Sequence, residues 1–427
     1  MKCQIMRSAV LIFFLSCFYL LSFSQRECGS IVYMDKLIRQ DTRLQNRLTG
    51  VDSFTRDWIN RKRTSTSPDN AQPSTSSIIR IPVVVHVIYN SAAQNISDGQ
   101  IHSQIEVLNQ DYRHQNPDAA NTPSFFRSVA ADCEIEFALA TQDPLGNPSS
   151  GIVRKHTSIY GFNFDDRVKS TADGGDDPWN PDIYLNIWVA NLSSGILGFS
   201  SLPGAPKESD GVTIQYTAFG TNGTAQAPFN RGRTATHEIG HWLNLIHIWG
   251  DMDCGDDHVD DTPPQKGPNR GCPGGEIKTC ANSTYGDMYM NFMDFTDDVC
   301  MNIFTIDQKL RMHSLFAEGG VRNAILHSAV ANTIGIQPLA ISQFDESPQT
   351  KIQIYPNPAA DMVYIKLPDS VDLPVQMGIY NTLGQKMMSF TMQQKLQQVN
   401  LSRLGKGIYY LQSDSRSAKY LARLSKM

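Results

Sequence analysis

Two histidines and a glutamate stand at positions that suit a metal-dependent reaction. His237 and His241 lie four residues apart in RTATHEIGHWLNLIHIWGD (233–251), and Glu238 follows the first of them. Residues four apart share one face of an α-helix, so both imidazoles can bind one ion. Imidazole nitrogens are preferred zinc ligands, and a catalytic zinc keeps one position open for water. We therefore predict a helix that carries a zinc site, with Glu238 as the general base beside it.

Both ends of this helix are also predicted. Thr234 or Thr236 can cap its first turn. His247 lies six residues after His241, about a turn and a half further along a straight helix. It joins the other histidines only if the chain leaves the helix and turns back, which needs a residue that tolerates the left-handed conformation. Asn244 stands where this exit is needed, and Asn is second to Gly in that conformation.

The alternative is an ordinary amphipathic helix whose histidines face the core or the solvent. We favour the metal site because Glu238, Asn244 and His247 all fall at the required offsets from His237. The pattern is the His-Glu-x-x-His arrangement of zinc peptidases.

A second motif downstream adds to this pattern. HEIGHWLNLIH (237–247) is similar to the extended metzincin signature, His-Glu-x-x-His-x-x-Gly-x-x-His, with Asn244 in place of the usual glycine. YMNFMDFTDD (289–298) resembles the methionine turn beneath the metal of metzincins, with Met293 as its methionine. Together with a region of four cysteines, these motifs resemble the pappalysin family of metzincins over roughly residues 79–335.

The resemblance implies an endopeptidase with a twisted, mostly parallel sheet above the cleft and the active-site helix below it. It implies that His237, His241 and His247 bind Zn²⁺. Glu238 would then act first as general base and next as general acid.

Two residues of the methionine turn bear on activity and specificity. Two residues after Met293, where pappalysins can have a tyrosine that stabilises the oxyanion, this chain has Phe295, which has no hydroxyl. Asp298 matches an acidic residue at the base of the family's specificity pocket, where a buried carboxylate would favour Arg or Lys just after the scissile bond. The alternative is a surface aspartate in an acidic loop with Asp294 and Asp297.

An acidic loop follows the histidine helix. GDMDCGDDHVDDTPPQ (250–265) carries six aspartates within eleven residues. Many carboxylates in an irregular loop suit Ca²⁺, which takes six to eight oxygen ligands. By resemblance to calcium-binding relatives, the ligands would be Asp257, the Val259 carbonyl, Asp261 and Thr262. The alternative is a solvated acidic loop without an ion.

Cysteines suggest an oxidising compartment. Four of them lie in 254–300, and in an exported protein they can form two disulfides with three possible pairings. The resemblance implies the pairs Cys254–Cys280 and Cys272–Cys300, which would brace the acidic loop and the methionine turn.

Cys28 has a separate expected role. It lies in RECGS (26–30), which looks like the cysteine switch of latent metzincins. A thiolate is a strong zinc ligand and would displace the catalytic water. The alternatives are an unpaired thiol, or a disulfide with Cys133, which lies in a strand pattern and is expected to be a buried free thiol.

The remaining pattern indicates an α+β fold. The β-branched run 79–90 predicts a buried strand. A helix with Ser97 or Asp98 as its cap follows, and strands are expected within 133–140, 151–160, 184–192 and 211–219. Strands with few helices and no regular alternation are typical of this class.

Composition divides the chain further. Residues 1–24 have a positive start and an apolar run, which is typical of an export signal. Residues 25–78 are expected to be a propeptide and flexible linker, since RKRTSTSPDNAQPSTSS (61–77) can bury little surface. The catalytic domain is expected over 79–337 and a linker over 338–351. No later stretch is long and apolar enough to span a bilayer, so the mature form should have no integral membrane segment.

Residues 352–427 consist of short alternating segments punctuated by Pro, Asn and Gly, which predicts a small all-β sandwich. YPNPAADMVYIKLP, GKGIYYLQ and KYLARLSKM resemble the sorting domain of the type IX secretion system. The resemblance implies passage through the periplasm and outer membrane to a secreted or cell-surface location. The alternative is a carbohydrate- or protein-binding sandwich.

The sequence therefore predicts a secreted zinc endopeptidase, made as a latent precursor, that acts on protein or peptide substrates. The net charge of −5 shows no basic bias toward nucleic acid. One alternative is a catalytically weakened cell-surface binding protein on the same scaffold, which Phe295 supports. A zinc hydrolase with a non-peptide substrate is the third hypothesis.

Overall fold

The computed structural model forms two compact units, 1–335 and 336–427. The expected signal peptide (1–24) and the linker 338–351 lie outside the residues that the structure describes. Those residues are 26, 28–64, 78–193, 195–281, 283–328, 330, 352–367, 373–381, 386–413 and 421–426.

One mixed sheet organises the larger unit, in the order β2-β1-β4-β6-β5, with β3 also paired with β1. β1 is long enough to pair with β2 through its first half and with β3 through its second half. All neighbouring strands are parallel except β5 and β6, so β5 is an antiparallel edge strand. The strands are β1 (Ile79–Tyr89), β2 (Ile135–Leu139), β3 (Ile152–His156), β4 (Leu185–Ala190), β5 (Gly198–Ser200) and β6 (Val212–Gln215).

The sheet agrees with the expected α+β class, a mostly parallel sheet with few helices. Ile81–Ile88 of β1 are buried on both faces, as a central strand of parallel neighbours requires. The strand predicted over 211–219 ends at Gln215, because residues 216–218 form a 3₁₀ turn. β5 was not predicted, since three residues are too few to show an alternating pattern.

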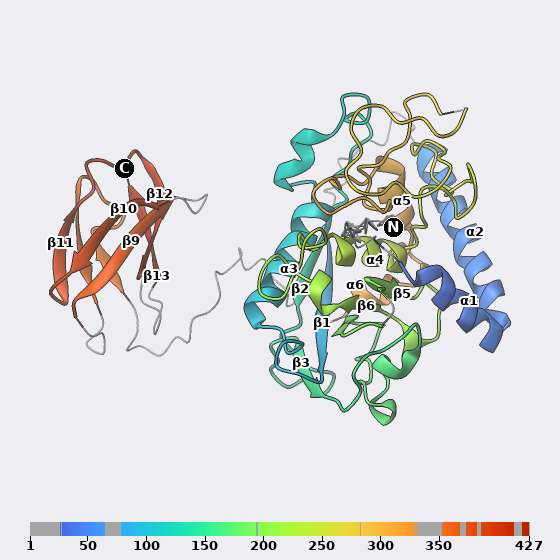
Figure 1. Cartoon of the computed structure of the whole chain (residues 1–427), viewed down its shortest axis with the longest axis horizontal. Helices are drawn as coiled ribbons and strands as arrows, with labels where there is room; N and C mark the ends of the chain where they lie inside the picture. Colours follow the sequence, from blue (N-terminus) through green and yellow to red (C-terminus); the bar gives the residue numbers. More distant parts are fainter. Residues whose placement is uncertain are drawn as a thin grey trace, which may run out of the picture. The chain divides into compact units, whose positions relative to one another are not determined.

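Helices pack against the sheet, and α4 carries two of the predicted zinc ligands, His237 and His241. Ser97 caps α3 by accepting a hydrogen bond from the Gln100 amide, as predicted. α4 contacts β5 and β6 at the edge of the sheet, and Figure 1 shows it beside them. The helices of this part are α3 (Asp98–Tyr112), α4 (Arg233–Trp242), α5 (Ile306–Ser314) and α6 (Asn323–Leu326).

The predicted caps of α4 are wrong. Its N-cap is Gly232, with a φ of 75°, and neither Thr234 nor Thr236 caps it. A carboxylate from outside does so instead, because Asp298 Oδ2 accepts from the main-chain amides of Arg231 (2.7 Å) and Arg233 (3.3 Å).

The described part of the expected propeptide (25–78) contains two helices, α1 (Ser30–Gln40) and α2 (Arg43–Thr64). α1 contacts β5 and lies beside it in Figure 1. Its Tyr33 packs in a buried cluster with Trp188 and Phe199. The segment predicted to be flexible from residue 61 is helical as far as Thr64, while 65–77 lie outside the described residues. Arg63 in this last turn forms ion pairs with Asp260 and Asp307, which explains the difference.

The smaller unit has two antiparallel sheets, β10-β9-β12-β13 and β11-β8-β7, as expected for a β-sandwich. Alternate side chains such as Val363 and Ile365 of β8 are buried in its own apolar core. The strands are β7 (Gln353–Tyr355), β8 (Met362–Lys366), β9 (Val375–Asn381), β10 (Lys386–Met392), β11 (Leu396–Asn400), β12 (Gly407–Ser413) and β13 (Leu421–Lys426).

Candidate active site

Three buried imidazoles converge at the end of α4. His237 and His241 lie on the helix, and the chain then turns back at Asn244, whose φ of 73° is the left-handed conformation that the spacing predicts. The turn brings Nε2 of His247 to 3.2 Å from Nε2 of His241. The ring of His237 lies 4.8 Å and 5.2 Å from those of His241 and His247, between centroids.

The main chain and one carboxylate orient these rings. Nδ1 of His237 donates to the Phe292 carbonyl (2.8 Å), and Nδ1 of His241 donates to the Leu245 carbonyl (2.9 Å). Nδ1 of His247 donates to Asp251 Oδ1 at 2.6 Å. Each ring therefore presents Nε2 to the centre, which is how outer hydrogen bonds orient metal ligands.

The chemistry of these nitrogens fits a zinc ion. Burial lowers the pKa of His237 well below its usual value and that of His241 to about 3, so both rings are neutral. Nε2 of His237 is buried and has no hydrogen-bond partner among the described residues. A buried acceptor nitrogen without a partner is costly, and a metal ion bound to its lone pair would satisfy it.

The propeptide covers this centre. Sγ of Cys28 lies 3.4 Å from Nε2 of His241 and 3.5 Å from Oε2 of Glu238. The Gly29 amide donates to the Gly198 carbonyl of β5 at 2.8 Å, so the segment follows the sheet edge. The alternative disulfide with Cys133 is wrong, because both cysteines are free and Cys133 is buried elsewhere.

Glu238 is also covered. Its Oε2 accepts a hydrogen bond from Ser30 Oγ at 2.8 Å. Its side chain is buried, and burial raises the pKa of Glu238 to about 7. The carboxylate therefore lies at the centre but faces the propeptide.

Met293 lies directly beneath the helix. It is fully buried, and a Cβ added at Gly240 would stand 2.4 Å from its Sδ. The helix and the methionine turn therefore need glycine at 240 for their close approach, and the Phe292 carbonyl that orients His237 belongs to the same turn.

Phe295 packs against the ligands. Its ring centroid lies 4.9 Å from that of His247, 5.6 Å from that of His237 and 5.0 Å from that of Trp249. Trp249 in turn stacks on His247 at 4.4 Å. In the absence of a hydroxyl, Phe295 supports the imidazoles by packing.

Comparison with known proteins follows this geometry. Residues 169–317 match the family model described as pregnancy-associated plasma protein-A, and 353–426 match the secretion system C-terminal sorting domain. An extracellular metalloprotease of Pyricularia oryzae is 32% identical over 256 residues, which cover 57% of this chain and 76% of the relative. This chain belongs to the pappalysin family of metalloproteases.

Solved pappalysin structures agree with the fold. Tannerella forsythia mature mirolysin in complex with a cleaved peptide is 50% identical with a TM-score of 0.58, over 60% of this chain and 98% of that one. A Tannerella forsythia promirolysin mutant is 46% identical with a TM-score of 0.63, over 72% and 99%. The chain is thus a metalloendopeptidase zymogen that is secreted or displayed at the cell surface. Within the described residues, no helix is long and apolar enough to cross a membrane.

In this pappalysin the side chain of Asp298 is fully buried rather than exposed in a surface loop. Its Oδ1 is paired with the guanidinium of Arg26, which is 2% exposed. Nε of Arg26 also donates to the Thr296 carbonyl (3.2 Å), and its Cζ lies 5.1 Å from the ring centroid of Phe229. No role was predicted for Arg26, although it is the arginine of RECGS.

The four cysteines form the disulfides Cys254–Cys280 and Cys272–Cys300, the pairing that the resemblance implied. The first ties the acidic loop to residue 280. The second ends two residues after Asp298 and so braces the methionine turn.

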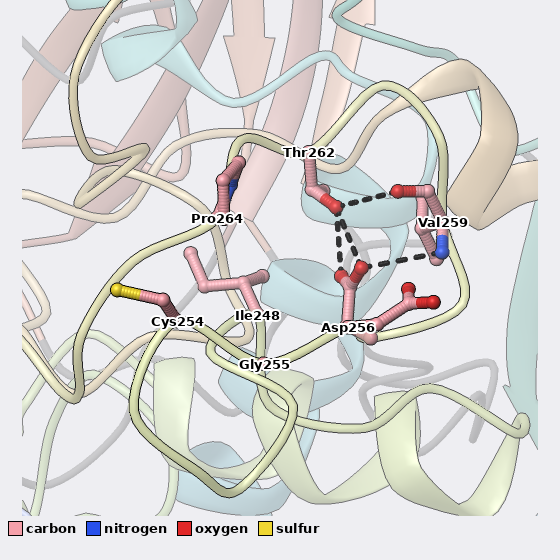
Figure 2. A pocket seen from close by; sticks show the side chains of 8 residues that line it. Ile248, Cys254, Gly255, Asp256, Val259, Thr262 and Pro264 are labelled. Carbon is pink, nitrogen blue, oxygen red and sulfur yellow. Dashed lines mark hydrogen bonds between the residues drawn. The ribbon is translucent and has the colours of Figure 1, made fainter. Parts of the chain in front are cut away.

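Three of the predicted calcium ligands meet in the acidic loop (Figure 2). Thr262 Oγ1 lies 2.8 Å from both carboxylate oxygens of Asp257 and 2.9 Å from the Val259 carbonyl. Asp261 does not join their hydrogen bonds. Its Oδ2 accepts from the Asp307 amide at 2.9 Å, and its Oδ1 is buried with no partner in the described part of the chain.

Proposed function

We propose that this pappalysin is a zinc endopeptidase in which His237, His241 and His247 bind the metal. Their convergence, with a buried Nε2 of His237 that no described residue satisfies, carries the proposal. Other transition metals also accept imidazole, but three buried imidazoles without a fixed fourth ligand suit catalytic zinc best.

Glu238 acts as general base and then general acid. When bound, zinc would lower the pKa of a water molecule and polarise the scissile carbonyl. Oε2 of Glu238 is the oxygen that Ser30 contacts in the latent form, so it becomes available when the propeptide leaves. It accepts the proton of the water and passes it to the leaving amine.

Cys28 keeps the precursor latent. Its Sγ and the three imidazole nitrogens lie within 4.8 Å of one another, so the thiolate can serve as the fourth ligand. Water is then excluded from the position that the reaction requires.

The enzyme favours Arg or Lys just after the scissile bond. Arg26 supports this assignment, since its guanidinium fills the pocket above Asp298 as a substrate side chain would. A charged hydrogen bond in a pocket closed to water discriminates strongly between basic and neutral side chains.

Ca²⁺ binds the acidic loop through Asp257, the Val259 carbonyl, Thr262 and Asp261. Burial raises the pKa of Asp257 to about 8 and that of Asp261 to about 6. The partnerless Oδ1 of Asp261 and the clustered oxygens of the loop are the donors that a hard cation prefers.

One observation favours a second function. Phe295 lacks the hydroxyl that can stabilise the oxyanion in relatives, which fits a weakened enzyme that acts as a surface binding protein.

The substitution Glu238→Gln separates the two functions. With the propeptide removed from both proteins by the same added protease, the variant should bind one zinc per chain, as the wild type does, and lose turnover of a peptide substrate. Equal turnover by the two proteins would refute the role of Glu238, and zinc-loaded wild type without turnover would support the binding protein.

A further inference from the structure

Arg270 holds the propeptide by its main chain. Its Nη1 donates to the carbonyl oxygen of Arg26 at 2.7 Å. Arg26 is also the residue whose side chain fills the pocket above Asp298. One residue of the propeptide is therefore bound twice, through its side chain by Asp298 and through its carbonyl by Arg270.

The loop of Arg270 is fixed from both sides. Asn269 hydrogen-bonds Asp294 through its amide nitrogen and its Nδ2, each at 2.8 Å. The Gly271 carbonyl accepts from the Asp297 amide at 2.9 Å. The following residue forms the disulfide Cys272–Cys300. These bonds join the loop to the methionine turn, so they restrict the position of the main chain that carries the Arg270 side chain.

The guanidinium also lies close to the zinc ligands. Its Cζ is 5.6 Å from the ring centroid of Phe295, within the range of a cation–π contact. Phe295 packs on His237 and His247. Arg270 therefore contacts both Phe295, which packs on the zinc ligands, and Arg26, the residue that Asp298 binds.

We propose that Arg270 binds substrate, by donating to a main-chain carbonyl next to the basic residue that Asp298 holds. The contact recognises a group present in every peptide, so it does not depend on the sequence of the propeptide. This inference rests on the proposed function, because it takes the pocket of Arg26 to be the substrate pocket.

The direction of the bound peptide does not remove the contact. Cys28 pairs with Gly198 of β5 in the parallel sense. A residue held in the pocket has one carbonyl on each side along the chain, its own and that of the preceding residue. In a substrate that runs the opposite way, the carbonyl of the preceding residue, which belongs to the scissile bond, takes the place of the Arg26 carbonyl beside Arg270.

Steady-state kinetics test this inference on zinc-loaded enzyme processed from the full chain. Two peptides would differ only in Arg or norleucine after the scissile bond. Arg270→Gln should lower kcat/KM about tenfold for both peptides, the effect of losing one part-buried charged hydrogen bond. Arg270→Lys should recover part of the loss. An unchanged kcat/KM for both peptides would overturn the assignment.

A control variant and a second measurement keep the outcome clear. Arg154→Gln is the control variant. Arg154 on β3 also donates to a main-chain carbonyl, but that carbonyl belongs to Ile96 of the enzyme itself (2.7 Å). This variant should therefore leave the kinetics unchanged. Asp298→Asn should weaken only the arginine peptide. If Asp298→Asn has no such effect, the substrate pocket proposed above fails, whereas a failure of Arg270 alone leaves that pocket intact.

Discussion

Sγ of Cys28 lies 3.4 Å from Nε2 of His241, although 213 positions separate the two residues along the chain. The contact is held by β5, whose Gly198 carbonyl accepts from the neighbouring Gly29 amide. The main-chain hydrogen bond to the sheet edge therefore places the Cys28 thiol beside the metal ligands, and latency depends on it.

Replacement of Cys28 should release activity before the propeptide is cut. Cys28→Ala removes the thiol that lies beside the three imidazoles, so water can reach the centre. Hydrolysis of a fluorogenic peptide by the intact chain, with its length checked by mass spectrometry, measures the effect. Cys133→Ala is the control, because that thiol is buried away from the imidazoles and should leave latency unchanged. A Cys28→Ala precursor as inactive as the wild type would refute the switch.

Asp298→Asn should reduce the preference for basic residues after the scissile bond. The change keeps an acceptor for the amides of Arg231 and Arg233 but removes the charge that binds Arg26. Loss of a buried charged hydrogen bond costs about 1.5–3 kcal/mol, which lowers kcat/KM for an arginine peptide roughly 10- to 150-fold. A preference equal to that of the wild type would remove Asp298 from the pocket.

The parts of the zinc site that could be predicted are those whose residues lie close together in the sequence. Helical spacing placed His237 and His241 together, and the need for an exit turn predicted the conformation of Asn244. The cap of α4 could not be found in this way, because it comes from Asp298, 65 residues beyond Arg233. Thr236 was available but donates its hydroxyl to Asp111 instead.

The binding of α2 to the rest of the larger unit should be weakened by a substitution on this helix that is remote from the Cys28 thiol. Thr55 Oγ1 is buried and contacts Ser314 Oγ (2.9 Å) and Asn244 Nδ2 (3.1 Å). Thr55→Val leaves both partners without this hydrogen bond, at a cost of about 1–3 kcal/mol.

Hydrogen–deuterium exchange of the α2 amides in the intact precursor measures this loss. Exchange should rise roughly tenfold in Thr55→Val, given the size of such hydrogen-bond losses. Thr49→Val is the matched control on the same helix, since the exposed hydroxyl of Thr49 donates to the Gln45 carbonyl within α2. Equal exchange in the two variants would show that Thr55 does not anchor the helix.

The stability of the precursor should rise between about pH 8 and pH 10 because of Lys169. Burial lowers the pKa of Lys169 to about 8. Its buried Nζ donates to the Ser209 carbonyl and to Tyr33 Oη. An unfolded lysine keeps its proton to about pH 10.4, so the unfolded chain binds more protons in this range and folding gains as pH rises.

Lys169→Met isolates this effect, because it keeps a long apolar side chain without the charge. The free energy of unfolding of the wild type, relative to the variant, should increase by about 3 kcal/mol from pH 8 to above pH 10. Urea denaturation of both proteins in the Glu238→Gln background measures it. A difference that is constant with pH would contradict the burial of a charged Lys169.

Removal of calcium should destabilise the larger unit. A ligand at 100 times its Kd stabilises by about 2.7 kcal/mol, so adding Ca²⁺ to calcium-free, zinc-loaded protein should raise the melting temperature. Asp257→Asn should abolish the rise, and Asp256→Asn should not, because Asp256 is 80% exposed. A rise that persists in Asp257→Asn would place calcium elsewhere.

Patterns within one element predicted most of the fold, while contacts between distant segments were out of reach. The apolar run of β1 and the Ser97 cap of α3 are local and were predicted correctly. The edge strand β5 has three residues and is stabilised by pairing with β6. Arg26 and Asp298 are 272 residues apart, so only the folded chain shows that they meet.

Cleavage of a proteome-derived peptide library tests whether the protein is a zinc endopeptidase that depends on Glu238. Wild type and Glu238→Ala, both freed of the propeptide by the same added protease, would be compared with and without a zinc chelator. The account predicts that only the wild type without chelator cleaves the library, with Arg or Lys just after the scissile bond. Cleavage of the same peptides by Glu238→Ala, or by the wild type with chelator, would contradict it.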